Sequence, residues 1–260
     1  MSKRKSDYCF GVVKLAAVFL LALAPLPGQA QSLPATKLVI GIDEDANTFV
    51  GIWGRLNYAE ISRRLGIPIE VRTFPQQRRS EMTDSGAIDG ETSRIYAYGA
   101  AHPNLVRVEE VLADLHFGLY AANPTLRIHR LEDLSATTLR GEYRRGVLFC
   151  EKALKSVLPE DRLSDVADSI QGARKLLAGR TDVYCDLEFA MLGALHDPAI
   201  QGVPRVHRLL DLGNIPTYPY LHKKHAELAP RMAAVVKQMN AEGLVEAYKL
   251  QAQRELGWLR

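Results

Sequence analysis

The chain has 260 residues, of which 33 are basic and 30 are acidic, for a formal net charge of +3. A chain of this length can bury a full core, as one domain or as two lobes. The whole net charge comes from residues 1–30, which hold four basic residues and one acidic residue. The remaining 230 residues balance 29 basic against 29 acidic side chains. Because these charges balance, the remaining chain has no excess of positive charge to favour binding to nucleic acid or to an acidic membrane.

The first thirty residues have the pattern of a secretory signal peptide. Residues 2–5 are polar and basic, residues 12–26 form an apolar run broken only by Lys14, and Gly28-Gln29-Ala30 offers a small-residue cleavage site. The run is short and interrupted for a membrane span, and a retained N-terminal anchor is the alternative. We expect cleavage after Ala30 and export to the periplasm.

Two cysteines, Cys150 and Cys185, remain once Cys9 leaves with the signal peptide. In an exported protein such a pair is a disulfide candidate. Both are expected at the ends of neighbouring strands, where their Cα atoms could come within the ~4.4–6.8 Å that a disulfide needs. Two buried thiols are the alternative. The chain has no C-x-x-C or H-E-x-x-H motif, and we expect neither a metal site nor a cofactor.

Strands and helices alternate through the first part of the mature chain. The patterns predict strands at 37–43, 67–74 and 87–89, with helices at about 51–65 and 75–86 between them. Gly66 stops the first helix. The order strand–helix–strand–helix–strand is typical of a parallel sheet. Two more strands are predicted at 105–112 and 115–121.

A second unit of similar size begins near Asn123. Its predicted elements are a helical turn at 131–134, strands at 143–150, 163–166 and 181–186, and helices at 151–157, 169–178 and 187–195. Asp168 or Ser169 can cap the second of these helices. An extended piece at 205–212, a helix at 222–241 and an amphipathic piece ending at residue 258 complete the chain.

Extended connections near Gly118 and Asp211 suggest two lobes joined by two crossings. We expect lobe 1 at 31–117, lobe 2 at 118–210, and a return to lobe 1 at 211–260. A hinge of this kind lets a ligand be enclosed between the lobes.

The stretch 86–108 holds the first candidate for a ligand site. Arg94 follows a predicted strand that ends in Asp89-Gly90-Glu91. An arginine just past a strand end lies where open α/β sheets present groups to a ligand. Arg94 could hold a ligand carboxylate in a cleft, or it could be paired on the surface, for example with Glu91.

Six short motifs span most of the mature chain: 75–80 (PQQRRS), 86–91 (GAIDGE) with Arg94, 103–108 (PNLVRV), 139–141 (LRG), 176–183 (LLAGRTDV) and 220–225 (YLHKKH). Their order and spacing resemble bacterial periplasmic solute-binding proteins of the polar amino-acid-binding type, extracellular solute-binding family 3, in a divergent branch. The resemblance implies an α/β periplasmic-binding-protein fold. Each lobe would be a doubly wound, mainly parallel sheet, and the lobes would close on a small polar solute.

The resemblance also implies roles for two charged residues. Arg94 matches an arginine that clamps the α-carboxylate of the ligand, a group that suits a guanidinium fork. Asp186 matches an aspartate that accepts the α-ammonium, although it could instead cap the helix that follows. The chain departs from the pattern at Glu91, where threonine is customary. It departs again at 149–151, where Phe-Cys-Glu replaces a glycine-led turn.

Five further residues could line the cleft. Arg78 matches an arginine of the branch motif, although its early place in a helix also fits a solvated face. Glu44 follows the first strand, where ligand-binding loops lie. Phe49, Trp53 and Tyr96 could stack on a ligand, with core packing as the alternative.

These patterns favour a periplasmic protein that captures a small polar solute, amino-acid-like or carboxylate-bearing, for an ABC-type importer or a sensor. We expect a monomer without catalytic residues. One alternative is a dehydratase-like enzyme on the same scaffold, with Glu44, Glu91 or Asp186 as the acid or base. The other is an accessory or sensory module with a degraded pocket.

Overall fold

The computed structural model describes residues 37–200 and 206–259. The predicted signal peptide, residues 1–30, lies outside the described residues. The chain from Ala35 onward forms one compact unit. None of the helices within the two described ranges has both the length and the apolarity that a membrane crossing requires.

In the described part of the chain, nine strands form one sheet in the order β2-β1-β3-β9-β5-β8-β6-β7, with β4 paired to β9. The strands are β1 (Leu38–Ile42), β2 (Ile69–Thr73), β3 (Gly90–Ile95), β4 (Leu105–Arg107), β5 (Ala113–Ala121), β6 (Gly141–Arg144), β7 (Leu163–Val166), β8 (Val183–Leu187) and β9 (His207–His222). The α-helices are α1 (Phe49–Leu65), α2 (Gln76–Asp84), α3 (Tyr98–Ala101), α4 (Leu148–Lys155), α5 (Ser169–Leu177), α6 (Glu188–His196), α7 (Ala229–Ala241) and α8 (Leu244–Glu255). Short 3-10 helices lie at Leu131–Ala136, Glu160–Arg162 and Lys223–Leu228.

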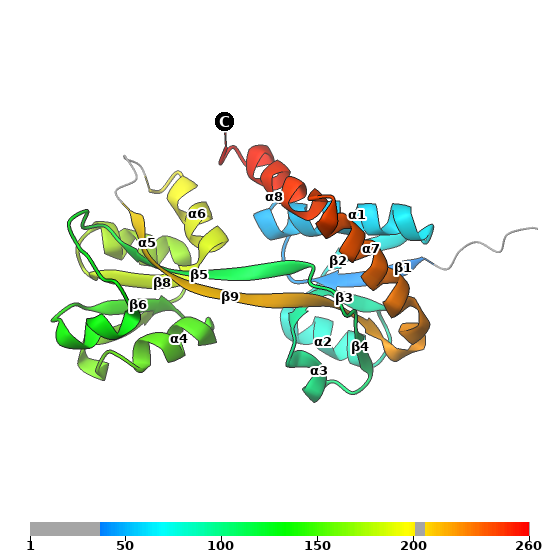
Figure 1. Ribbon diagram of the computed structural model, residues 1–260, viewed down its shortest axis with the longest axis horizontal. Coiled ribbons are helices and arrows are strands. Elements are labelled where there is room, and N and C mark those ends of the chain that lie inside the picture. Colours follow the sequence, from blue (N-terminus) through cyan, green and yellow to red (C-terminus); the bar gives the residue numbers. More distant parts are fainter. Residues whose placement is uncertain (1–36, 201–205, 260) are drawn as a thin grey trace, which may run out of the picture. The chain divides into compact units, whose positions relative to one another are not determined.

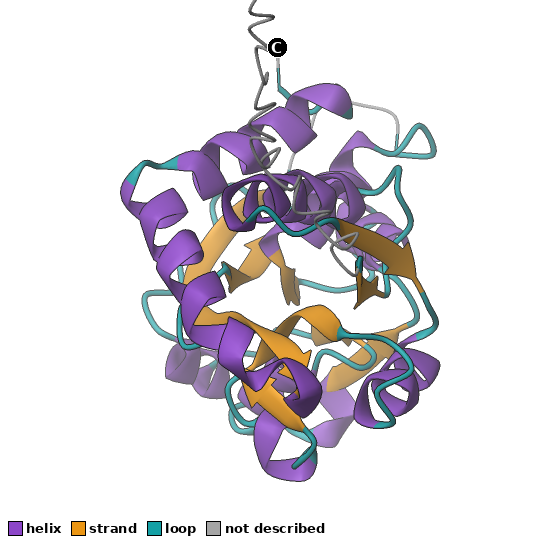
Figure 2. Ribbon diagram, turned by 90° about the vertical axis from the view of Figure 1, so that its right-hand side faces the viewer, coloured by secondary structure: helices purple, strands orange, loops and turns teal. Residues whose placement is uncertain are grey.

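Parallel pairing is confined to the two ends of the sheet. At one end β1 pairs in parallel with β2 and β3, and at the other β6 pairs in parallel with β7 and β8. We call β1–β4 with α1–α3, α7 and α8 lobe 1, and β6–β8 with α4–α6 lobe 2. Figure 2 shows helices on either side of the strands, as parallel sheets require.

Two long antiparallel strands, β5 and β9, run side by side through both lobes (Figure 1). Gly118 pairs with Asp211, and the register shifts between His116 and Gly118. The two positions at which the sequence predicts crossings are therefore direct neighbours. The predicted lobe limits at residues 117 and 210 fall inside these shared strands, and the limits themselves stay a prediction.

Each lobe has its own hydrophobic core. In lobe 1, Ile40, Ile61 and Met232 are fully buried, each with 0% of its surface exposed. In lobe 2, Leu134 and Leu154 are equally buried. Each such side chain stabilises the fold by about 1.5–3 kcal/mol, which makes these cores rigid supports for the groups at the strand ends.

Local signals at the helix ends explain most boundaries. Thr48 caps α1 by accepting a hydrogen bond from the Gly51 N–H at 3.1 Å, and Gly66 ends the helix with a left-handed φ of 68°. Asp168 caps α5 by accepting from the Gln171 N–H at 2.8 Å. Pro230 lies in the first turn of α7, where its missing N–H has no consequence. The end of α1 at Gly66 and the cap of α5 at Asp168 are as predicted, whereas the helix predicted to start at residue 222 starts at Ala229, after β9 and a short 3-10 helix.

The prediction of a third strand at 87–89 is wrong, because the strand is β3 at Gly90–Ile95. A Cβ at Gly90 would lie 2.4 Å from the carbonyl oxygen of Tyr220. The glycine therefore permits close approach to β9 instead of a turn. As a result, Arg94 lies within β3 and not beyond a strand end.

The prediction of a strand at 143–150 is also wrong. The strand β6 ends at Arg144, Gly146 adopts a positive φ of 86°, and α4 begins at Leu148. Cys150 therefore lies on a helix. The strand predicted at 105–112 is shorter than expected, since β4 covers only Leu105–Arg107.

Candidate functional site

The carboxyl ends of the parallel strands carry most of the charged side chains of the candidate site. Asp43 and Glu44 directly follow β1, Arg94 lies near the end of β3, Arg144 ends β6 and Asp186 lies near the end of β8. Ligands of open α/β sheets bind beyond the carboxyl ends of the strands, so this edge is where a solute site is expected.

In lobe 1, the fully buried carboxylate of Glu91 contacts three side chains. Glu91 has 0% exposure, and its Oε2 accepts from Arg94 Nε at 2.5 Å. The Tyr98 hydroxyl donates to Glu91 Oε1 at 2.8 Å. Arg79 Nε lies 3.0 Å from Oε2 but without the angle of a hydrogen bond. The interpretation that Arg94 pairs with Glu91 is confirmed, and the pair is buried, not on the surface.

Arg79 is a member of this cluster that the sequence did not single out. Its side chain is 2% exposed, and its Nη1 donates to Asp43 Oδ1 at 3.0 Å. Burial, followed by the positive charge of Arg94, lowers the pKa of Arg79. The predicted candidate, Arg78, is exposed instead. One local pattern agrees with the burial of Arg79. Thr83 follows it by one helical turn, and these two residues form the buried face of α2.

Arg94 is only 12% exposed, and its remaining contacts also lie within lobe 1. Its Nη2 donates to the Ser80 hydroxyl at 3.0 Å, and its Cζ lies 4.6 Å from the ring centre of Tyr98. Among the described residues, Nη1 has no hydrogen-bond acceptor. Contact with a ligand through that nitrogen stays a prediction.

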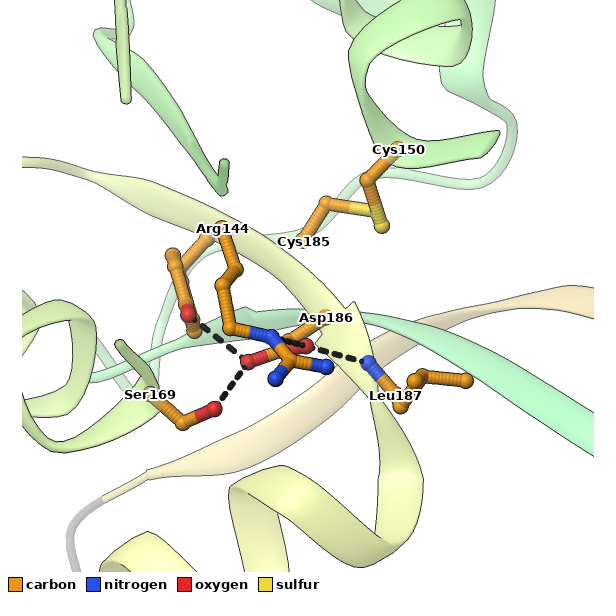
Figure 3. The surroundings of a disulfide bond; sticks show 7 residues. Arg144, Cys150, Ser169, Cys185, Asp186 and Leu187 are labelled. Atoms are coloured by element: carbon orange, nitrogen blue, oxygen red, sulfur yellow. Dashed lines mark hydrogen bonds and ion pairs between the residues drawn. A yellow bond between two sulfur atoms is a disulfide. The ribbon is translucent and has the colours of Figure 1, made fainter. Parts of the chain in front are cut away.

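In lobe 2, Asp186 is a second fully buried carboxylate. It accepts hydrogen bonds from the Ser169 hydroxyl at 2.5 Å, the Tyr184 hydroxyl at 2.7 Å, the Leu187 N–H at 2.7 Å and Arg144 Nε at 3.0 Å (Figure 3). A carboxylate has about four acceptor positions, and here all are occupied. The alternative that Asp186 caps the following helix is wrong, because α6 begins at Glu188 with Leu187 as its N-cap and has no side-chain cap hydrogen bond. Acceptance of a ligand ammonium by Asp186 stays a prediction.

Arg144 is the exposed partner of this pair. Its side chain is 29% exposed, and only Nε is engaged within the described residues. In Figure 3 the guanidinium of Arg144 lies against the carboxylate of Asp186, with Nε as the bonded nitrogen. The following residue, Arg145, is 70% exposed and pairs with Asp165 instead. Sequence reasoning missed Arg144, because neither arginine of the pair stands out.

Glu44 is a half-buried acid with no ion pair among the described residues. Burial, and then the nearby charge of Asp43, raise the pKa of Glu44 above its usual 4.5. The Thr48 hydroxyl and the charge of Arg144 act in the opposite direction. Contact of a ligand with Glu44 stays a prediction.

Two of the three aromatic candidates, Phe49 and Trp53, pack against other parts of the protein. Phe49 is 4% exposed, and its ring centre lies 5.8 Å from Trp53, 5.7 Å from Phe189 and 5.4 Å from Trp258. The Trp53 indole donates to the Val245 carbonyl at 2.9 Å. These contacts match the core-packing alternative for Phe49 and Trp53.

Tyr96 differs from the other aromatic candidates because it is 60% exposed. The Cζ of Arg107 lies 3.5 Å from the centre of its ring. Tyr96 therefore stacks on an arginine of lobe 1, and its contact with a ligand stays a prediction.

A disulfide joins Cys150 to Cys185, with Cα atoms 5.5 Å apart. The predicted bond is confirmed, and it connects α4 to β8 next to Asp186 (Figure 3). Within residues 37–200 and 206–259, no three His, Cys, Asp or Glu side chains are placed to hold a metal ion.

The fold has counterparts among solved structures. The chain is similar to the L-cystine solute receptor of Neisseria gonorrhoeae, at 13% identity and a TM-score of 0.66, over 83% of this chain and 91% of that one. It is similar to a histidine kinase sensor domain with similarity to periplasmic binding proteins, at 14% identity and a TM-score of 0.62, over 84% and 96%. It is also similar to an ancestral amino-acid-binding protein, a precursor of cyclohexadienyl dehydratase, at 16% identity and a TM-score of 0.58, over 83% and 94%.

The fold is therefore that of the periplasmic solute-binding proteins of the amino-acid-binding type, as the sequence motifs predicted. No protein-family model matches the chain. In sequence it is 31% identical over 245 residues to an uncharacterized protein of Shewanella oneidensis, across 94% of this chain and 90% of that protein. The chain belongs to the same family as that protein.

Proposed function

We propose that the protein is a periplasmic solute-binding protein that captures a small zwitterionic or carboxylate-bearing solute between its lobes. The observation that carries this proposal is Arg144. Its Nε is held by the buried Asp186, while its two terminal nitrogens have no partner among the described residues. A guanidinium held in this way is a preformed receptor for a carboxylate.

The preformed geometry has an energetic consequence. Asp186 is itself fixed by Ser169 and Tyr184, so Arg144 loses little conformational freedom when a ligand binds. Ordering a long side chain otherwise costs about 0.5–1.5 kcal/mol. The planar fork matches a carboxylate with two parallel hydrogen bonds.

The acidic side of the proposed site lies on lobe 1. Asp43, Glu44 and Asp45 follow one another after β1, and Glu44 has no ion pair among the described residues. An ammonium group placed there would offset the burial and the repulsion by Asp43 that raise the pKa of Glu44. The resulting assignment reverses the one that the sequence suggested. The ligand carboxylate is now assigned to lobe 2 and the ammonium to lobe 1.

A thermal-shift screen with amino acids, small carboxylates and polyamines tests the proposal. A ligand at about 100 times its Kd stabilises the folded state by about 2.7 kcal/mol. We expect a positive shift with wild type that is lost in Arg144→Ala and kept in Arg145→Ala, which is the matched control. No shift with wild type, or equal shifts in both variants, would contradict the proposal.

A role in uptake and a role in sensing both agree with this site. The similar structures include solute receptors and a sensor domain, and the partner would be a membrane permease or a sensor. Fractionation of cells would place the protein in the periplasm if the predicted signal is used.

One observation favours an enzyme as the second candidate. A carboxyl group with a raised pKa, such as Glu44, is suited to general acid catalysis. Mass spectrometry of a stabilising solute after incubation with the protein separates the two functions. An unchanged solute supports binding alone, and conversion that is lost in Glu44→Gln supports the enzyme.

A further inference from the structure

Aromatic rings from both lobes meet outside the shared strands β5 and β9. Phe49 begins α1 in lobe 1, and its ring centre lies 5.7 Å from that of Phe189 on α6 in lobe 2. Trp258, which follows α8 of lobe 1, stacks on Phe49 at 5.4 Å and on His196 of α6 at 5.8 Å. Ring centres of attractive aromatic pairs lie about 4.5–7 Å apart. Two of these three pairs therefore join one lobe to the other.

The end of α8 fixes the direction in which Trp258 leaves the helix. Gly257 has a positive φ of 71°, and its N–H donates to the Arg254 carbonyl at 2.9 Å. The Trp258 N–H donates to the Gln253 carbonyl at 2.8 Å. This pair of hydrogen bonds around a left-handed glycine closes the helix in a Schellman motif. Trp258 is therefore held by the helix end.

Gly193 of α6 is the point on lobe 2 against which the indole lies. A Cβ at this position would be 3.1 Å from each of two carbons of the Trp258 ring. Glycine is unfavourable inside a helix, but here it leaves room for the ring. Nearby, a cavity of about 330 Å³ is lined from α6 by Leu192 and from α8 by Gln253. The two helices are thus not packed along their length, and Trp258 bridges them at one end.

The strands that connect the lobes have a bending point of their own. Between the pairs His116–Asn214 and Gly118–Asp211, two residues of β9 lie opposite one residue of β5. One of these two residues is Gly213, which has a positive φ of 95°. A bulge of this kind bends its strand locally. A contact away from the strands, such as that of Trp258, is placed to fix the angle between the lobes.

We propose that Trp258 is a latch between the lobes. With its ring against Gly193 and His196, lobe 2 is held to lobe 1, and the lobes separate when the ring leaves this position. Loss of one aromatic pair should shift the equilibrium toward separated lobes by about two- to tenfold. The latch acts without a bound solute and does not depend on the role proposed for Arg144.

Small-angle X-ray scattering of the protein without solute tests the latch. Trp258→Ala removes the ring from lobe 1, and Gly193→Leu fills its position on lobe 2. Neither residue belongs to the buried core, so both variants should fold. We expect a larger radius of gyration in both than in wild type. Leu259→Ala, which changes the adjacent residue at 39% exposure, is the matched control and should leave the radius unchanged.

Fluorine NMR of protein labelled with 5-fluorotryptophan follows the ring itself. The chain has two tryptophans, so the Trp258 resonance is identified by its loss in Trp258→Ala. Gly193→Leu should shift this resonance and leave that of Trp53 in place. Together the two measurements separate movement of the ring from movement of the lobes.

Three results would overturn the proposal. An unchanged radius of gyration in Gly193→Leu, with the Trp258 resonance shifted, would make the contact passive packing. An unshifted Trp258 resonance in Gly193→Leu would show that the ring does not lie against α6. An equal increase of the radius in Leu259→Ala would remove the specific role of Trp258. A failed thermal-shift screen with amino acids would leave the latch untouched.

Discussion

Both lobes bury a carboxylate beneath an arginine, and they do so in different ways. In lobe 1, Glu91 is shared by two nearly buried arginines, Arg79 and Arg94. In lobe 2, Asp186 has one arginine, while Ser169 and Tyr184 supply hydroxyl groups. Each carboxylate has 0% exposure.

The difference separates a structural cluster from a receptor group. The lobe 1 arginines neutralise the buried Glu91 and, at 2% and 12% exposure, present little surface to a ligand. In lobe 1 one hydroxyl, that of Tyr98, bonds to the carboxylate, whereas in lobe 2 two hydroxyls and a backbone N–H do so. Both terminal nitrogens of Arg144 are left without a partner among the described residues. We therefore propose that the solute carboxylate binds to lobe 2 and that the Glu91 cluster supports the fold.

The largest expected effect is on the lobe 1 cluster. Glu91→Gln would leave Arg79 and Arg94 buried beside each other without their shared negative charge. Breaking a buried ion pair from one side costs about 3–5 kcal/mol, and we expect a loss of that size in the free energy of unfolding by urea denaturation. Glu109→Gln, which removes an exposed partner of Arg107, is the control. Losses below about 1 kcal/mol in both variants would refute the structural role.

The second effect is on the disulfide, which only lobe 2 has among the described residues. The bond joins residues 35 positions apart, and a bridge of that span stabilises by about 2–4 kcal/mol. We expect the double variant Cys150→Ala and Cys185→Ala to unfold at correspondingly lower urea. Free-thiol titration of wild type before and after reduction is the companion measurement. Free thiols in the unreduced protein would contradict the bond.

A third test asks whether Asp186 orients Arg144 or binds the ligand itself. A hydrogen bond to a charged group contributes about 1.5–3 kcal/mol. Asp186→Asn should therefore lower the affinity for an amino-acid ligand found in the thermal-shift screen by about tenfold or more. If Asp186 only orients Arg144, the same factor applies to the analogue that lacks the amino group. A loss confined to the amino-bearing solute would restore the assignment made from the sequence.

The smallest effect is the pH dependence of binding through Glu44. Its pKa is raised from 4.5 in the folded protein, so the stability linked to its protonation is present at low pH and is lost as pH rises through the raised pKa. A ligand ammonium needs the ionised form. Affinity should fall as pH is lowered through that raised pKa, measured by calorimetry at several pH values.

The matched variant for this pH series is Glu44→Gln. It should bind the solute more weakly and show a flat profile over the same range. An unchanged profile in the variant would place the titrating group elsewhere.

The sequence predicted the fold well because its signals are local. The apolar run of β1, the stop at Gly66 and the cap at Asp168 each act within a few residues. The pattern could not place β3. A glycine is required at position 90 because the backbone there lies close to Tyr220, and Tyr220 is far along the chain. The same holds for Cys150, whose helix follows from the turn at Gly146.

The site was predicted less well, and adjacent arginines show why. At Arg78-Arg79 and Arg144-Arg145 the residue types are identical, and only the helical phase or the strand end decides which one is buried or faces the site. Asp186 stood out in the sequence, but two of its four hydrogen bonds come from residues on other elements, Arg144 on β6 and Ser169 on α5. Such saturation is a property of tertiary packing and leaves no local pattern.

A crystal structure of the protein with its strongest stabilising solute tests the central claim most directly. We expect a solute carboxylate within hydrogen-bond distance of the terminal nitrogens of Arg144, with Asp186 still bonded to Nε. A solute bound without contact to Arg144, or held by Asp186 after Arg144 has moved away, would contradict it.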